Sequence, residues 1–568
     1  MTKIYEFKRD FYYKVKSDIE HTNVLFLIGP RKTGKTVCMH QVENDWDGDV
    51  QYIDFKDKES DDEKEEVIDN VINDINHNYD KLYLIDEITY ACQPENAIER
   101  IANALSKRKA ASLSKIYTKV IITGSQSIAI ESWMYRSFAG NCGLVYTDFL
   151  TYKEWLAFEN REDITEESYM DFLLHVHEFY EFEDNDEFQS LEKYLQGCLD
   201  ETVISNQNTS NIIFGNHIDN LSVDILLTVL YTALFKLKDN NSKEAFIKEN
   251  ELGIVTGGYM SESVPKIKRS EIYRLISKSI FAKYNKFKML SENTIEQAVL
   301  FLKRAGLLVV EPYMRDGKTE LPNIDNDIIY HQGKIDFKND LFETYIFCIK
   351  YPMFYIACLK DILRDKMPER IPRDLLGRIV ECQIRGQLPQ NEAAEFRNEK
   401  QEEVDYVNIY HNLAVEVSIH NKTRNEVHFD KLPDICNNMQ HILLSQDKYS
   451  RLTDNIVEVP YYQFIYDISN QDAYHIHITI DKIPYTNSRK DKSWQIVKDN
   501  VSALAYDVRN DKIADFLCQS YITEDNITEY IDEAIQLEEC DAEVTDLLDK
   551  IEEARPEMSS IVQEIRNR

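Results

Sequence analysis

Residues 29–36 carry the clearest chemistry in this chain of 568 residues. They follow the apolar run Val24–Ile28 and read Gly29-Pro30-Arg31-Lys32-Thr33-Gly34-Lys35-Thr36. This is the P-loop pattern, in which a glycine turn lets backbone N–H groups approach phosphate oxygens and the next helix points its positive end at them. We expect Lys35 to pair with the β- and γ-phosphates of a nucleotide and Thr36 to ligate Mg²⁺. The nucleotide-binding segment is predicted to extend to Val37.

A pair of carboxylates, Asp86 and Glu87, ends the apolar run Lys81–Ile85. Such a run is typical of a buried parallel strand. In P-loop ATPases a carboxylate at this place holds Mg²⁺, and a neighbouring one can polarise the attacking water as a general base. We therefore predict metal binding by Asp86 together with Thr36, and base catalysis by Glu87.

Two more segments, Asp49–Phe55 and Lys119–Ser125, also predict strands. Four strands separated by helix-sized spacers predict an α/β fold with a parallel sheet and crossover helices. Thr123 and Ser125, at the end of the last strand, are candidates for sensing the γ-phosphate or the attacking water. Ordinary turn chemistry explains these two side chains equally well.

The order of these motifs, GPRKTGKT, LYLIDE, VIITGSQS and then RSFAG with YTDFLTYKEWLAF, resembles a group of bacterial and archaeal AAA-type ATPases. In that group the ATPase domain is followed by a helical lid, a winged helix and a nuclease-like domain of the PD-(D/E)XK type, often degenerate. Three later stretches fit the same pattern: Tyr194–Cys198 for the lid, Ser291–Leu308 for the winged helix, and Glu403–Val407 with Ala414–Val417 for the nuclease-like core. The resemblance covers residues 1–430.

The resemblance implies a chain of several domains, as the length also suggests. We expect an ATPase domain at 1–155, a helical lid at 156–240, a winged helix at 241–318 and a nuclease-like α/β domain at 319–490. Residues 491–568 are acidic and are predicted to be helical. They lie outside the resemblance, and we expect an interaction or oligomerisation element there.

Arg136 stands where the family has an arginine-containing segment. An arginine near a γ-phosphate stabilises the charge of the transition state, so Arg136 is a candidate catalytic residue. The alternative is a structural ion pair on a helix surface.

The nuclease-like region departs from an active PD-(D/E)XK site. The family pattern maps its three acids onto Glu381, Asp405 and Glu416, but Ser418 stands where the catalytic lysine belongs, and Lys422 falls past the predicted strand. Carboxylates at these places bind Mg²⁺ in active members, and the lysine assists attack on the phosphate. We expect the three acids to lie close together in a degenerate site that does not cleave nucleic acid.

The net charge of −34 argues against a protein that coats nucleic acid, because its field repels phosphate backbones. The stretch 266–288 is an exception, with eight basic residues and one acid, Glu271. It precedes a predicted helix at 292–304, for which Ser291 is a good N-cap and Ile295, Val299 and Leu302 form an apolar stripe. Residues 266–304 are therefore a candidate DNA contact; a solvated face or a lid contact remains the alternative.

The remaining sequence features concern the cellular compartment and two further predicted strands. Ten scattered cysteines without a C-x-x-C pair, no apolar run of 18 residues and an N-terminus without a signal-peptide pattern together predict a cytoplasmic protein. Tyr461–Tyr466 and His475–Ile480 read as strands, and His475 and His477 would share a strand face, where a metal pair is conceivable but a half-exposed strand fits better.

Three functions stay open on this reading. The first is an ATPase that uses ATP and Mg²⁺ and couples turnover to a partner or to DNA. The second is an ATP-gated oligomeric switch or scaffold, in signalling or defence, with little turnover. The third is a nuclease gated by ATP. A protein partner or a homo-oligomer fits each of them, and no membrane association is expected.

Overall fold

The structure is a computed structural model, and it forms two compact units. Unit 1 comprises Met1–Pro312 and Pro322–Gly386, and unit 2 comprises Tyr313–Leu321 and Gln387–Arg568. The residues that the structure describes are 6–111, 116–124, 127–138, 141–180, 191–208, 221–234, 285–314, 321–324, 328–331, 334–338, 341–363, 367, 371, 373–389, 393–398, 402–419, 428–436, 439–446, 448, 450–453 and 456–469.

Unit 1 contains a parallel five-stranded sheet in the order β2-β3-β4-β1-β5. Its strands are β1 (Val24–Ile28), β2 (Asp49–Asp54), β3 (Lys81–Asp86), β4 (Lys119–Thr123) and β5 (Gly143–Tyr146). The four predicted strands are confirmed to within one or two residues. The sequence reading missed β5, which has four residues, begins with glycine and ends with an exposed tyrosine, so it gives a weak strand signal.

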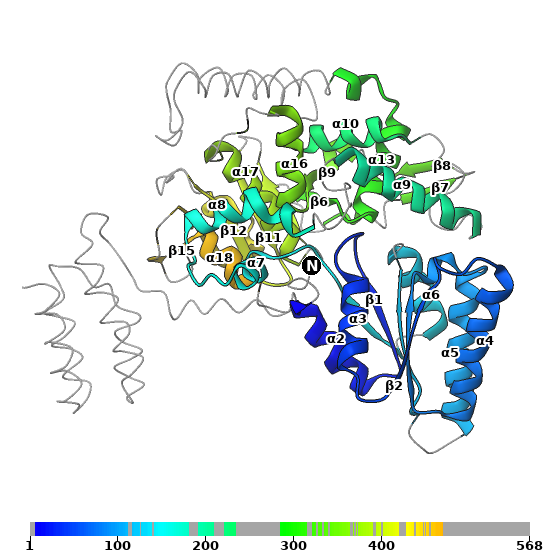
Figure 1. The fold of residues 1–568 in the computed structure, drawn as a ribbon. Helices are drawn as coiled ribbons and strands as arrows, with labels where there is room; N and C mark the ends of the chain where they lie inside the picture. Colours follow the sequence, from blue (N-terminus) through cyan, green and yellow to red (C-terminus); the bar gives the residue numbers. More distant parts are fainter. Residues whose placement is uncertain are drawn as a thin grey trace, which may run out of the picture. The chain divides into compact units, whose positions relative to one another are not determined.

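Helices cover both faces of this sheet (Figure 1). Val24, Phe26 and Ile28 point into a core shared with the helices α4, α5 and α6, while Leu25 and Leu27 point into a core shared with α2 and α3. This alternation is the two-residue period of a strand buried on both faces. The helices are α2 (Asp10–His21), α3 (Lys35–Asp45), α4 (Asp61–His77), α5 (Pro94–Ala111) and α6 (Ser127–Phe138). The predicted α/β core is thus confirmed.

The described residues between β5 and Leu234 are mostly helical. It contains α7 (Tyr152–Glu159), α8 (Glu166–His175), the 3₁₀ turn η2 (Val176–Tyr180), α9 (Leu191–Asn208) and α10 (Val223–Leu234). Capping boxes fix the starts of α7 and α8. The Thr151 side chain accepts a hydrogen bond from the backbone N–H of Glu154, whose side chain accepts one from the backbone N–H of Thr151. Thr165 and Ser168 do the same at the start of α8.

Helix α13 (Glu292–Arg304) has the predicted bounds, and the Ser291 side chain accepts a hydrogen bond from the backbone N–H of Thr294. The stripe of Ile295, Val299 and Leu302 is buried, but so is every residue from 295 to 302. A helix buried all round cannot lay its middle turns into a DNA groove. Any nucleic-acid contact of residues 266–304 must therefore come from the ends of α13 or from the residues before it, of which 266–284 lie outside the described part of the chain.

The rest of unit 1 adds a strand pair and two longer helices. Residues 308–312 of β6 (Leu308–Met314) pair antiparallel with β9 (Tyr345–Ile349). The other elements are β7 (Ile328–His331), β8 (Lys334–Phe337), α15 (Leu341–Thr344), α16 (Pro352–Leu363) and α17 (Arg373–Gln387).

Unit 2 is built on a mixed sheet with the order β14-β15-β13-β12-β11-β10, and Tyr313 and Met314 pair parallel with β10. A core that includes Phe396, Val407 and Leu443 packs on one face of it. The strands are β10 (Ala393–Arg397), β11 (Glu403–Asn408), β12 (Leu413–Val417), β13 (Gln440–Ser445), β14 (Ser450–Thr453) and β15 (Ile456–Pro460), with the 3₁₀ turns η6 (Phe429–Lys431) and η7 (Asp434–Cys436). A second α/β region is therefore present where a nuclease-like domain was expected.

The predicted strand at Tyr461–Tyr466 is wrong, because these residues begin helix α18 (Tyr461–Ile468). Its buried residues are Tyr461, Phe464, Ile465 and Ile468, which recur at helical spacing. The run of aromatic residues suggested β-structure, but the burial follows the 3.6-residue period. The predicted strand with His475 and His477, and the expected helical extension 491–568, lie outside the described residues.

Two global expectations can be compared with the described residues. None of their helices combines the length and the apolar composition needed to span a bilayer. The eight cysteines among them carry free thiols.

A buried ion pair connects the start of unit 1 to the helix after the sheet. The Arg9 guanidinium contacts the Glu154 carboxylate at 2.7 and 3.1 Å, and both side chains are more than nine-tenths buried. Arg9 also donates to the backbone carbonyls of Thr33, in the P-loop, and of Asp148, at 3.0 and 2.7 Å. Burial by itself favours a raised pKa for Glu154, but the Arg9 charge outweighs it and the pKa is lowered.

We predict that Glu154→Gln lowers the free energy of unfolding of the ATPase region by about 3 kcal/mol, because it leaves the Arg9 charge buried without a counter-charge. Differential scanning calorimetry of the full chain measures this loss. Lys153→Met is the matched control, since Lys153 pairs with Asp10 at 3.7 Å on the surface and should change stability by less than about 0.5 kcal/mol. Equal effects of the two changes would contradict the assigned role of the buried pair.

Candidate nucleotide-binding site

The P-loop connects β1 to α3 through two glycines that no other residue could replace without strain. Gly29 has φ +154°, and a Cβ at this position would lie 2.2 Å from the carbonyl oxygen of Thr147. Gly34 has φ +90° and ψ +20° and is the N-cap of α3. The left-handed region and the close backbone contact both require glycine. The predicted turn is thus present, with the N-terminus of α3 directly behind it, and Val37 half-buried in the first turn of this helix.

Lys35 lies folded over this turn. Its ammonium donates to the carbonyls of Gly29 at 2.9 Å and Pro30 at 2.7 Å, and the side chain is buried. Burial lowers the pKa of Lys35 to about 8, although the charges of Glu87 and Asp86 act in the opposite direction. A cation held this way can exchange two carbonyl contacts for the stronger contact with a phosphate.

Thr36 and Asp86 come together as the spacing predicts. The Thr36 hydroxyl donates to Asp86 Oδ2 at 2.8 Å, and the Tyr52 hydroxyl, from β2, donates to the same oxygen at 2.9 Å. Burial and the Asp86 charge raise the pKa of Tyr52, so this phenol stays a donor. A hydroxyl and a carboxylate at one point are the protein ligands that Mg²⁺ takes beside phosphate oxygens. The donor set therefore fits Mg²⁺.

Glu87 follows Asp86 in the left-handed conformation, with φ +52°. Its backbone N–H donates to Asp86 Oδ1 at 2.9 Å, so the strand end turns sharply there. The Glu87 carboxylate forms an ion pair of 2.9 Å with Lys56, whose ammonium lies 5.1 Å from the centre of the Tyr90 ring. Burial favours a lower pKa for Lys56, but the Glu87 charge outweighs it and the pKa is raised.

Two buried hydroxyls lie near the carboxyl ends of β3 and β4. Thr123, the predicted sensor at the end of β4, is completely buried, and its hydroxyl has no hydrogen-bond partner among the described residues. The same holds for Thr89, which lies in the 3₁₀ turn η1 (Ile88–Tyr90) after Glu87 and packs against Gly124. A buried polar group without a partner is costly and often functional. Ser125 lies outside the described residues.

Arg136 does not join the P-loop residues through any contact that the structure describes. It lies near the end of α6, its side chain is half exposed, and it pairs with Glu95 of α5 at 3.0 Å. This is the structural ion pair considered as the alternative. A catalytic role of Arg136 stays a proposal.

The segments matched to the lid and winged helix pack on the P-loop. The Tyr194 hydroxyl points to the Arg31 carbonyl at 3.5 Å, and a Cβ on Gly197 would lie 3.0 Å from the Arg31 guanidinium. Gly306, after α13, would likewise place a Cβ 3.0 Å from the Pro30 ring. The P-loop is therefore in direct contact with α9 and with the residue that follows the end of α13.

Sequence reasoning missed Lys56, Tyr52, Thr89 and Arg9. None of them stands in a motif, and each reaches the site through tertiary contacts. The strand end at Asp54 gave one usable signal, since it brings Lys56 to the carboxyl edge of the sheet, where ligands of open α/β sheets bind.

Two of the three predicted nuclease-like acids lie on neighbouring strands of unit 2. Asp405 on β11 and Glu416 on the neighbouring β12 are both buried, and Asp405 Oδ2 accepts a hydrogen bond from the backbone N–H of Val417 at 2.8 Å. Ser418 is buried just after β12. Glu381 lies on α17 in unit 1, and Lys422 lies outside the described residues. Among the described residues no group of three or more His, Cys, Asp or Glu side chains is arranged to hold a metal.

Comparisons with known proteins extend this description. Residues 21–156 match the AAA domain family. Among solved structures, the chain is similar to the Walker-type ATPase PABY2304 of Pyrococcus abyssi (11% identity, 62% of this chain and 95% of that chain, TM-score 0.31) and to the ORC2 protein of Aeropyrum pernix (11%, 63% and 92%, TM-score 0.26). The chain is also similar to the structure of the replication initiator DnaA bound to AMPPCP and single-stranded DNA (16% identity, 52% of this chain and 93% of that chain, TM-score 0.22). No curated protein matches.

The parallel sheet and the glycine geometry of the turn after β1 are those of a P-loop NTPase core. The match of residues 21–156 to the AAA domain family agrees with this fold.

Lys35 provides a pH-dependent test of this site. Its pKa is about 8 in this structure, and contact with phosphate oxygens must raise that pKa on binding. Below pH 8 the ammonium is already charged and affinity should not depend on this group. Above pH 8 binding must take up a proton, so affinity for ATP should fall by up to about tenfold per pH unit. Calorimetric titration at pH 9 in buffers of different ionisation enthalpy measures the uptake directly.

The comparison at pH 7 serves as the control, because almost no uptake by Lys35 is expected there. Binding at pH 9 without proton uptake would show that Lys35 does not pair with the nucleotide as a charged group.

Proposed function

We propose that this protein binds ATP with Mg²⁺ at residues 29–37 and hydrolyses it. The observation that carries the proposal is the contact between Thr36 and Asp86, with Lys35 over the same turn and Glu87 next in sequence. These residues combine a phosphate-binding turn, a cation, a metal-binding pair and a base in one place. The family match over residues 21–156 supports it.

The proposed mechanism gives each side chain one task. The P-loop amides and Lys35 bind the phosphates, and Thr36 and Asp86 hold Mg²⁺, which neutralises charge on the β- and γ-phosphates. Glu87 polarises the attacking water, and Thr123, with Ser125, senses the γ-phosphate or orients this water. Arg136 is proposed to supply a positive charge to the transition state, for which it must leave Glu95.

A second candidate function, an ATP-gated switch with slow turnover, is favoured by one observation. Glu87 is paired with Lys56 at 2.9 Å, so the proposed base is engaged by a cation of the protein itself. A carboxylate neutralised in this way is a poor base. Turnover would then wait until a partner or a second copy separates the pair.

DNA coupling and the nuclease-like region complete the proposal. Contact with DNA through residues 266–304 is supported by the basic composition of 266–288 and limited by the burial of α13. For unit 2 we propose a degenerate nuclease-like site without cleavage, supported by the neighbouring Asp405 and Glu416 and by Ser418 in place of a lysine.

Lys35→Ala should weaken Mg-ATP binding by at least about a hundredfold, because it removes the cation that pairs with the phosphates. Equilibrium titration with a fluorescent ATP analogue measures this loss. Lys32→Ala is a matched control: Lys32 belongs to the same loop but lies half-buried at φ +61°, and its loss should cost far less. Unchanged affinity in the Lys35 variant would refute nucleotide binding at this loop.

Glu87→Gln should keep the affinity for Mg-ATP and slow hydrolysis by about a hundredfold or more, because the amide keeps the shape and loses the base. Steady-state phosphate release, recorded with and without DNA together with the oligomer mass, measures turnover and separates the two candidate functions. DNA-stimulated turnover favours the coupled ATPase, and nucleotide-dependent assembly with little turnover favours the switch. If the Glu87 variant turned over normally, another residue would be the base.

A further inference from the structure

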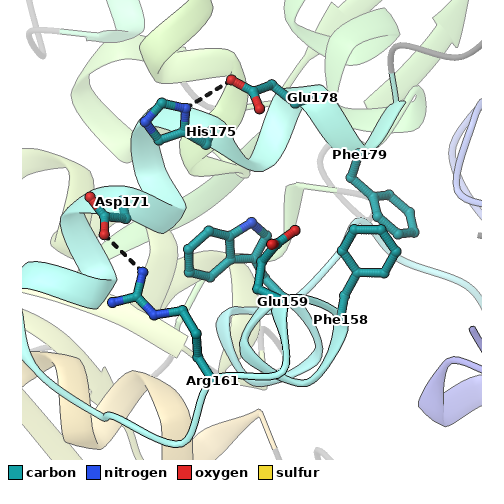
Figure 2. Close-up of a pocket in the computed structure, with 8 residues that line it drawn as sticks. Phe158, Glu159, Arg161, Asp171, His175, Glu178 and Phe179 are labelled. Atoms are coloured by element: carbon teal, nitrogen blue, oxygen red, sulfur yellow. Dashed lines mark hydrogen bonds and ion pairs between the residues drawn. The ribbon is translucent and has the colours of Figure 1, made fainter. Parts of the chain in front are cut away.

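A cavity in unit 1 is formed by α7, α8 and η2, and none of its lining residues belongs to the P-loop (Figure 2). Its volume is about 490 Å³, within the range of small-ligand sites. Aromatic and charged side chains line it: Trp155, Phe158, Glu159, Arg161, Asp171, His175, Glu178 and Phe179.

One wall of the cavity is aromatic. The Phe158 and Phe179 rings meet edge to face at 4.9 Å, and Figure 2 shows them side by side. The Phe7 ring packs edge to face on Phe158, with 5.4 Å between the ring centres. Trp155 is almost fully buried and supplies a further rigid apolar surface. Such a wall suits the aliphatic stem of a long side chain or the face of a planar cation.

The remaining lining is negative. Three carboxylates, Glu159, Asp171 and Glu178, line the cavity with a single permanent cation, Arg161. Arg161 is already bound at 2.8 Å to Asp171 and at 2.7 Å to Asp163, outside the lining. The charge of Arg161 is therefore already neutralised by two carboxylates.

Two of the carboxylates are open to a ligand. Glu159 makes no hydrogen bond or ion pair within the described residues and is exposed. Glu178 bonds to His175 Nδ1 at 2.8 Å through one oxygen, and its side chain is 60% exposed. In Figure 2 the Glu159 and Glu178 side chains come from different elements, α7 and η2.

Arg161 shows which ligand chemistry this lining accepts. Its guanidinium lies 5.6 Å from the centre of the Trp155 ring and binds two carboxylates at once. The protein's own arginine thus already uses the combination of an aromatic face and paired acids. Guanidinium is weakly hydrated, stacks on rings and binds carboxylates with two parallel bonds, which ammonium cannot do.

We propose that this cavity binds an arginine side chain of a partner protein. The guanidinium pairs with Glu159 and Glu178, and the arginine methylenes pack on Phe158 and Phe179. The net charge of −34 steers a basic segment toward the protein, and the cavity selects the arginine. This site is independent of the nucleotide chemistry proposed for the P-loop.

The test uses the full chain and the peptide acetyl-Gly-Arg-Gly-Arg-Gly-amide, labelled for fluorescence anisotropy. A citrulline peptide of the same length keeps the shape without the charge, and a lysine peptide keeps the charge without the planar head. The arginine peptide should bind at least about tenfold more tightly than either. Glu159→Gln with Glu178→Gln should weaken its binding by at least about tenfold without changing the melting temperature, since both side chains are exposed.

A variant with the same charge change elsewhere is the control. Asp62→Asn with Glu66→Gln removes two exposed acids from α4, where there is no aromatic wall, and should change affinity by less than about twofold. Equal weakening by the two variants would show that only the long-range field attracts the peptide. No binding to the wild-type chain, or equal binding of the lysine or citrulline peptide, would also overturn the proposal.

Discussion

The Arg9 guanidinium is the interaction on which the geometry of the P-loop region depends. It contacts the Glu154 carboxylate, the Thr33 carbonyl in the P-loop and the Asp148 carbonyl after β5. One buried cation thereby ties the chain before β1, the phosphate-binding turn and the start of α7 to a common point. Because the charge is buried, every one of its partners must stay in place. Contacts within the protein therefore hold the P-loop turn in place.

The charged side chains around this turn are bound to protein groups that a nucleotide and its Mg²⁺ could replace. Lys35 is bound to two carbonyls, Asp86 accepts from Thr36 and Tyr52, and Glu87 is paired with Lys56. In the proposed mechanism Lys35 would exchange its partners for phosphate oxygens, Asp86 for Mg²⁺ and Glu87 for the attacking water. Two buried hydroxyls near this site, those of Thr123 and Thr89, lack hydrogen-bond partners among the described residues.

The sequence predicted the contact between Thr36 and Asp86 because its signals are local. The apolar runs before Gly29 and before Asp86 define two buried strands, and parallel strands carry their carboxyl ends to one edge, so Thr36 and Asp86 had to meet. Signals that depend on tertiary contacts were missed: Arg9 and Glu154 are 145 residues apart, and Lys56 belongs to no motif. The spacing of apolar residues correctly predicted helix α13. At α18 the aromatic composition suggested a strand, although the spacing of the buried residues is helical. Burial on every side of α13 could not be foreseen, because the apolar stripe identifies only one face.

The central claim is that the P-loop, Asp86 and Glu87 form one ATP-hydrolysing site. A single-turnover experiment with excess protein and ATP labelled on the γ-phosphate tests it most directly, with Mg²⁺ or with EDTA. The account predicts that the bound ATP is converted to ADP and phosphate with Mg²⁺, remains intact in EDTA, and remains largely intact in an Asp86→Asn variant even with Mg²⁺. Bound ATP that stays intact with Mg²⁺ over hours, whatever DNA or partner is added, or cleavage that is unaffected by EDTA and by the Asp86 change, would contradict it.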